Sequence, residues 1–134
     1  MLRLTSGSCL IPHPDKAARG SEDALFANDE MNALGVADGV GGWIFHGVDP
    51  GVYAWELMCF TEQAVLSGEL DPVKALRRTY DGNQERGTST ACVAVLKEGD
   101  LVSINLGDSG FIVIRDGQVF QSRSVTIHSF NFPF

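Results

Sequence analysis

The chain has 134 residues, of which 44% are hydrophobic and 20% charged, and its net charge is −7 at pH 7. This length suits one domain with a substantial core, and the composition excludes a disordered tail. Because an acidic surface repels phosphate backbones and anionic lipids, we expect this chain to bind neither nucleic acid nor a membrane surface.

The sequence gives few signals for a compartment. The longest uninterrupted apolar run covers residues 91–96, far short of the roughly 20 residues of a spanning helix, so we expect no membrane insertion. The first 14 residues lack the apolar stretch of a secretory signal. Three widely spaced cysteines, Cys9, Cys59 and Cys92, predict no disulfide framework and favour a reducing compartment such as the cytoplasm.

Two short strands are expected near the start of the chain. The runs 23–27 (DALFA) and 33–37 (ALGVA) are typical of strands, and the polar residues 28–30 between them predict a turn. The second run leads into the glycine-dense stretch 38–43, which favours a loop over a strand interior.

Two helices are expected next. Residues 52–67 are apolar on most faces, which predicts a helix buried between two layers. Asp71 followed by proline is typical of a helix start and predicts a second helix over residues 72–82. In this helix Val73, Leu76 and Tyr80 recur at helical spacing, so we expect them to form its apolar face.

The third part of the chain predicts a β meander over residues 88–122. Its expected strands are 90–96, 101–106, 111–115 and 118–121. Asp108 and Ser109 lie in one of its turns, where local hydrogen bonding is the favoured interpretation. Two strands, two helices and four strands in this order indicate an α+β fold in a single domain, residues 1–134. After Arg123 the pattern fades, which leads us to expect a truncated domain.

Acidic residues carry the candidate chemistry. Glu22 and Asp23 open the first expected strand, and Asp38 ends the second. If these strands pair in antiparallel fashion, the three carboxylates gather at one edge of the sheet, where a cation would neutralise their repulsion. Oxygen ligands on a glycine turn suit Mg²⁺ or Mn²⁺, and Gly39 lets a backbone carbonyl approach the ion. The alternative is that these residues are an ordinary strand-start acid and an ordinary turn acid.

Six segments of the chain occur together and in order in one known family. They are SEDALF (21–26), LGVADGVGGW (34–43), GVDP (47–50), GTSTACVAVL (87–96), NLGDSGFIVIRDG (105–117) and HSFNFPF (128–134). On these segments the chain resembles the metal-dependent protein phosphatases, the type 2C serine/threonine phosphatases. Within that family it resembles the branch of mitochondrial and plastid members, and the resemblance covers nearly the whole chain.

The resemblance implies an α-β-β-α sandwich, in which antiparallel sheets are flanked by helices and two divalent ions lie at one end of the sheets. In the family a bridging water attacks the phosphorus of phosphoserine or phosphothreonine. Asp38 matches the aspartate that bridges both ions, Gly39 the carbonyl ligand, and Glu22 the glutamate that reaches the ions through water. Asp23 is a further candidate ligand, and Arg19 is the candidate phosphate-binding residue.

The chain departs from the family pattern in two respects. Many members have a histidine after the Asp-Gly pair, where this chain has Val40, so another acid or a metal-bound water is needed to protonate the leaving oxygen. The family's domain is also longer, and its downstream portion carries two further metal-binding aspartates. We therefore expect weak metal binding, little turnover, and unpaired sheet edges that favour self-association.

The sequence leaves three functions open. The leading interpretation is a serine/threonine phosphatase that acts on a phosphoprotein with Mg²⁺ or Mn²⁺. The first alternative is a non-catalytic phosphoprotein-binding or regulatory product of the same family, and the second is an unrelated carboxylate-rich ion-binding domain. The resemblance implies a mitochondrial or plastid location.

Overall fold

The computed structural model describes residues 2–15, 20–82, 86–122, 127–129 and 132–133. Its central element is an antiparallel sheet with the strand order β1-β2-β3-β4. The strands are β1 (Asp23–Asn28), β2 (Ala33–Asp38), β3 (Ala91–Lys97) and β4 (Asp100–Leu106). The prediction of two strands at 23–27 and 33–37 is therefore confirmed, as are the first two strands of the predicted meander.

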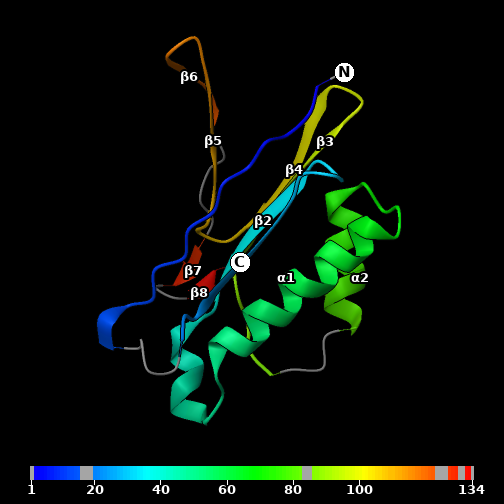
Figure 1. Ribbon diagram of the computed structural model, residues 1–134. Coiled ribbons are helices and arrows are strands. Elements are labelled where there is room, and N and C mark those ends of the chain that lie inside the picture. The colour runs from blue at the N-terminus through cyan, green and yellow to red at the C-terminus, as the bar shows by residue number, and fades with distance from the viewer. Residues whose placement is uncertain (1, 16–19, 83–85, 123–126, 130–131, 134) are drawn as a thin grey trace.

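Two helices, α1 (Pro50–Leu66) and α2 (Pro72–Gly82), cover one face of this sheet (Figure 1). α1 lies against β1 and β2, and α2 lies against β3 and β4. This arrangement confirms the predicted α+β fold class. None of the helices in the described part of the chain is long and apolar enough to cross a membrane.

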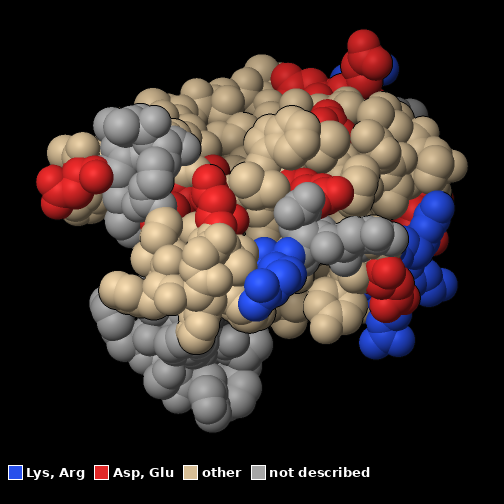
Figure 2. All heavy atoms as spheres, turned by 90° about the horizontal axis from the view of Figure 1, so that it is seen from below, with Lys and Arg blue, Asp and Glu red and all other residues tan. Residues whose placement is uncertain are grey.

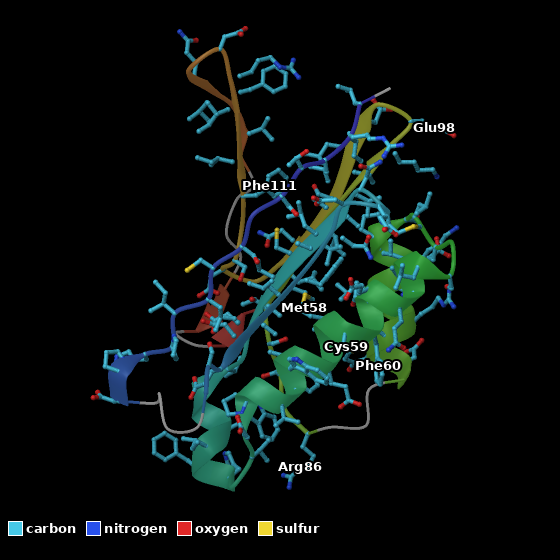
Figure 3. The ribbon with its side chains drawn as sticks, in the orientation of Figure 1. Met58, Cys59, Phe60, Arg86, Glu98 and Phe111 are labelled. Atoms are coloured by element: carbon cyan, nitrogen blue, oxygen red, sulfur yellow. The ribbon has the colours of Figure 1, made fainter. Side chains whose placement is uncertain are left out.

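The core lies between the sheet and the two helices. Because side chains alternate between the faces of a strand, every second residue of each strand points at the helices. Phe26 of β1, Gly35 of β2 and Val93 of β3 are neighbours in register on this face, and Met58 points at the sheet from α1 (Figure 3). A Cβ atom on Gly35 would come within 2.6 Å of the Phe26 ring, so the glycine makes room for that ring in the core.

The structure corrects the prediction that α1 is buried between two layers. α1 buries one face, which includes Tyr53, Leu57 and Met58, whereas the Trp55 side chain on another face is exposed. Both the sheet and α2 lie against the buried face. The high apolar content of α1 therefore does not mean that the helix is buried on all sides.

The predicted apolar face of α2 is also wrong in two of its three residues. Leu76 is buried, but Val73 is 46% exposed and Tyr80 is 69% exposed. The buried positions next to Leu76 are instead Ala75 and Thr79. These small side chains let α2 pack closely against α1, and they turn the larger Val73 and Tyr80 toward the solvent.

The stretch between β2 and α1 is more ordered than predicted. Residues Gly41–His46 form a short 3-10 helix, η2, where the glycine content favoured a loop. Gly47 ends this helix in the left-handed conformation, with φ of 73°. α1 then begins at Pro50, two residues earlier than predicted, because the Asp49 side chain accepts a hydrogen bond from Gly51 N–H at 2.8 Å and caps the helix.

The predicted strands 111–115 and 118–121 are present, but the prediction that they continue the meander of the main sheet is wrong. β5 (Ile112–Arg115) and β6 (Gln118–Ser122) pair with each other in a hairpin that projects from the main sheet (Figure 1). The predicted Asp116–Gly117 turn is confirmed, with both residues at positive φ. Phe111 lies between β4 and this hairpin, where the chain leaves the sheet (Figure 3). Beyond the hairpin, β7 (Ile127–Ser129) and β8 (Phe132–Pro133) pair with each other.

The cap of α1 can be tested by substitution. Asp49→Ala should lower the free energy of unfolding by about 1 kcal/mol, because the Gly51 N–H loses its acceptor in the first turn. Asp49→Asn retains an acceptor and should cost less. Urea unfolding followed by circular dichroism measures both variants, and equal stability of the two would contradict the proposed cap.

Candidate functional site

Acidic residues meet at one end of the sheet. β1 and β2 pair in antiparallel fashion with Asp23 directly opposite Asp38, and Glu22 immediately precedes β1. The predicted strand pairing is thus confirmed, and it brings these acids together. Seen from this end of the molecule, opposite to the turn at Glu98, several acidic side chains reach the surface (Figure 2).

Backbone hydrogen bonds fix Asp38 on both sides. Its N–H donates to the Thr90 hydroxyl at 2.8 Å, and its carbonyl accepts from Thr90 N–H at 2.9 Å. On the other side, Gly39 N–H donates to the Glu22 carbonyl at 3.0 Å. Val40 is buried, and its N–H donates to the Thr88 carbonyl at 2.9 Å. The end of β2 is therefore held rigidly between the segments before β1 and before β3.

Close backbone packing requires glycine after Asp38. A Cβ atom on Gly39 would lie 2.5 Å from the Pro50 carbonyl oxygen and 2.6 Å from the Glu22 carbonyl oxygen. Both atoms belong to the backbone, so no side-chain movement relieves the overlap. The sequence indicated that Gly39 leaves a carbonyl accessible, and the structure adds that the start of α1 and the start of β1 close in on this residue.

The concentration of negative charge changes the acidity of Asp38. Partial burial of its carboxyl group and a side-chain hydrogen bond with Asp23 raise the pKa of Asp38 from 3.8 to about 7. The negative charges of Asp23, Asp108 and Glu22 act in the same direction. Although Asp38 as a residue stays exposed, its carboxyl group faces three other acids, so near neutral pH it retains a proton for part of the time.

Asp108 is the member of this group that the sequence did not identify. It was predicted to be a local turn residue, yet its charge is close enough to raise the pKa of Asp38. Its neighbour Ser109 makes a short hydrogen bond with the Thr90 hydroxyl, which itself accepts from Asp38 N–H. The signal for this placement is the strand register: β4 ends at Leu106 opposite Ala91, so the following turn lies at the Asp38 end of the sheet.

The phosphate-binding candidate Arg19 lies outside the described residues. The remaining candidates Glu22, Asp23, Asp38 and Gly39 lie together, and the roles assigned to them stay predictions. In the described part of the chain, no three side chains of His, Cys, Asp or Glu are placed to hold one metal ion between them. Asp23 and Asp38, opposite each other in the strand register, nevertheless offer oxygen ligands of the kind that a divalent cation takes, because Mg²⁺ needs only one or two carboxylates when water and phosphate supply its other ligands.

Sequence comparison places this geometry in a known context. Probable protein phosphatase 2C 80 of Arabidopsis thaliana is 49% identical over 137 residues, which cover 99% of this chain and 33% of that protein. The chain is a protein phosphatase 2C homologue. Probable protein phosphatase 2C 55 of the same plant is 47% identical to this chain over 99% of the chain's length. The protein phosphatase PTC7 homolog fig of Drosophila virilis is 43% identical over 87% of the chain. No family model matches this chain.

Solved structures agree with the sequence relatives. The photosystem II phosphatase PBCP superposes on 93% of this chain with a TM-score of 0.87 and 38% identity, and the match covers 51% of the PBCP chain. The phosphatase MsPP of Mycobacterium smegmatis shares the fold, with a TM-score of 0.60 at 18% identity. This chain thus spans 29% to 33% of the length of the two Arabidopsis relatives and about half of PBCP, and it corresponds to their N-terminal part.

The raised pKa of Asp38 predicts a pH dependence of stability in the absence of metal. Between about 4 and about 7, the folded chain binds more protons at Asp38 than the unfolded chain, in which the carboxyl titrates near 3.8. The free energy of unfolding should therefore fall as the pH rises through this window.

Thermal unfolding in EDTA at several pH values tests this expectation. The stability of the native chain should decline relative to Asp38→Asn from pH 4 to pH 7, because the amide does not titrate. Parallel curves for the two proteins would show that the pKa of Asp38 is not raised in the folded chain.

Proposed function

We propose that this chain forms part of a metal-dependent serine/threonine protein phosphatase, and that its acids hold the divalent ions for hydrolysis of phosphoserine or phosphothreonine. The observation that carries the proposal is the strand register that places Asp23 directly opposite Asp38 at the sheet end, with Glu22 next to it. The chain in which this pair occurs matches protein phosphatase 2C sequences over 99% of its length. Mg²⁺ and Mn²⁺ are the ions that suit these oxygen ligands.

Each residue has a distinct role in this proposal. Asp38 would bridge two ions, Glu22 would reach them through water, and the Gly39 carbonyl would be a direct ligand. Asp23 and Asp108 would add negative charge beside Asp38, as their effect on its pKa supports. When bound, the ions lower the pKa of an attacking water and neutralise charge on the phosphoryl oxygens.

The backbone around Asp38 supports its role by preorganisation. Thr90 holds both the N–H and the carbonyl of Asp38, so the backbone that carries the carboxylate is fixed before an ion arrives. Val40, whose side chain is buried, supplies no general acid. A water or another acid would therefore protonate the leaving oxygen.

We also propose that this chain by itself binds metal weakly and turns over slowly. In the described residues, no group of three His, Cys, Asp or Glu side chains is placed around one ion. Substrate phosphate would complete the coordination of an ion held by so few carboxylates. A phosphoprotein is the proposed substrate, and a plastid or mitochondrial location is proposed because PBCP is a photosystem II phosphatase and fig is a PTC7 homologue.

Mn²⁺ titration tests the proposed site even when binding is weak. Bound Mn²⁺ broadens nearby NMR signals, so the amide signals of residues 22–23, 38–39 and 108 should broaden first. Asp38→Asn should abolish this selective broadening. Asp100→Asn is the matched control, because Asp100 pairs with Lys97 at the opposite end of the sheet and should leave the broadening unchanged. Broadening centred on other residues would contradict the site.

Hydrolysis of a phosphothreonine peptide then tests the activity. We expect slow release of phosphate that requires Mn²⁺, that is lost in Asp38→Asn and that persists in Asp100→Asn. Release that is unaffected by Asp38→Asn would contradict the proposed roles. Binding of the peptide without any hydrolysis would instead support a non-catalytic phosphoprotein-binding product of the same family.

A further inference from the structure

One arginine near the acidic site is held by an aromatic ring. The guanidinium carbon of Arg86 lies 5.9 Å from the centre of the Trp43 ring, within the range of a cation–π contact. The indole N–H of Trp43 donates to the Thr88 hydroxyl at 2.8 Å, so the ring is itself fixed. Arg86 is exposed, and its side chain points away from the molecule at its lower end (Figure 3). This cation is therefore both held in place and accessible.

The segment that carries Arg86 leads directly to Asp38. Thr90, whose N–H donates to the Asp38 carbonyl at 2.9 Å, lies four residues beyond Arg86, so the Cα atoms of Arg86 and Thr90 are at most about 14 Å apart. Between them, Ser89 forms a β-bridge with Gly39. Because an extended peptide rises about 3.3 Å per residue, this span corresponds to about four residues of a substrate.

Arg86 is a positive charge without an acidic partner in an acidic chain. The net charge is −7, and the carboxyl group of Asp38 faces three other acids at the end of the sheet. Acidic and basic side chains both reach the surface at this end of the molecule (Figure 2). In the described part of the chain, however, Arg86 makes no ion pair. Because the acids repel an anionic substrate, an exposed cation close to them is the group that attracts one.

We infer that Arg86 binds a second negative charge of the substrate, carried by a residue within about four positions of the phosphorylated one. This charge is the carboxylate of an acidic residue or a second phosphate, since a guanidinium group donates hydrogen bonds to either. The inference rests on the proposed function, because it requires the phosphorylated residue to lie at Asp38. It names the substrate class more closely, as phosphoproteins with an acidic or doubly phosphorylated segment.

Binding of fluorescent phosphothreonine peptides tests the inference without requiring turnover. The peptides form pairs that carry either glutamate or glutamine at one position, and this position is moved up to about five residues to either side of the phosphothreonine. In Mn²⁺ at low ionic strength, fluorescence anisotropy should show that glutamate strengthens binding about two- to fivefold at one or more positions, as one exposed ion pair can. This preference should disappear in about 0.5 M NaCl, because salt screens exposed charges.

Variants of Arg86 locate the contact. Arg86→Gln should remove the preference for glutamate, and Arg86→Glu should reverse it, so that a peptide with lysine at that position binds more tightly. A merely structural effect of the substitution would not reverse the preference. Arg115→Gln is the matched control, because Arg115 also lies over an aromatic ring, that of Phe120 at 4.2 Å, but in the β5–β6 hairpin. This control should retain the preference of the native chain.

A third peptide, with phosphoserine in place of the glutamate, identifies the source of the charge. If glutamate and phosphoserine both strengthen binding through Arg86, the site accepts any acidic neighbour of the phosphorylated residue. If only phosphoserine does so, the site is specific for a second phosphate. Either result supports the inference, because both need the positive charge of Arg86.

The inference and the proposed function fail in different ways. If phosphothreonine and threonine peptides bind equally, the acidic site does not receive the phosphate, and both proposals are wrong. If phosphothreonine strengthens binding but glutamate and phosphoserine at the neighbouring positions never do, only the role of Arg86 is overturned. A preference for glutamate that persists in Arg86→Gln also overturns that role, and it would place the contact at another cation, such as Arg77 of α2.

Discussion

The antiparallel pairing of β1 with β2 is the constraint on which the site depends. It places Asp23 opposite Asp38, so two carboxylates that repel each other in water are held side by side at the end of the sheet. The two aspartates stay opposite each other because the strand pairing continues through six residue pairs. Hydrogen bonds with Thr90 and Glu22 also hold the backbone of Asp38 and Gly39. The folded chain thus stores an unfavourable charge arrangement that a proton or a cation relieves. This arrangement is the physical basis for a proposed cation site.

The parts of the fold that the sequence predicted are those governed by local pattern. Alternating strands, the Asp116–Gly117 turn and the helix start at Pro72 after Asp71 all follow from short-range preferences, and each is present. Errors arose where a distant partner decides the outcome. Val73 and Tyr80 have the right spacing for an apolar face, but the approach of α1 selects Ala75 and Thr79 instead.

The same distinction applies to the site. Glu22, Asp23 and Asp38 could be brought together from sequence because their strands are neighbours along the chain. Asp108 could not, because its position depends on the register of β3 with β4 and on the hydrogen bond between Ser109 and Thr90. The sequence likewise indicated only one of the two reasons for glycine at position 39, namely an accessible carbonyl. The crowding by the Pro50 carbonyl could not be predicted, because it depends on where α1 begins. The chemistry proposed for these residues comes from the family resemblance, while the structure supplies the contacts that hold them.

The fold itself raises the pKa of Asp38, because it partly buries the carboxyl group and holds it beside other acids. An NMR titration of the Asp38 carboxyl carbon in the metal-free chain measures this pKa, with Asp23→Asn measured alongside. We predict a midpoint of about 7 in the native chain and a lower midpoint in Asp23→Asn, because the variant loses the negative charge opposite Asp38. A midpoint near the ordinary value of 3.8 in both proteins would show that the fold neither buries the Asp38 carboxyl group nor couples it to the other acids.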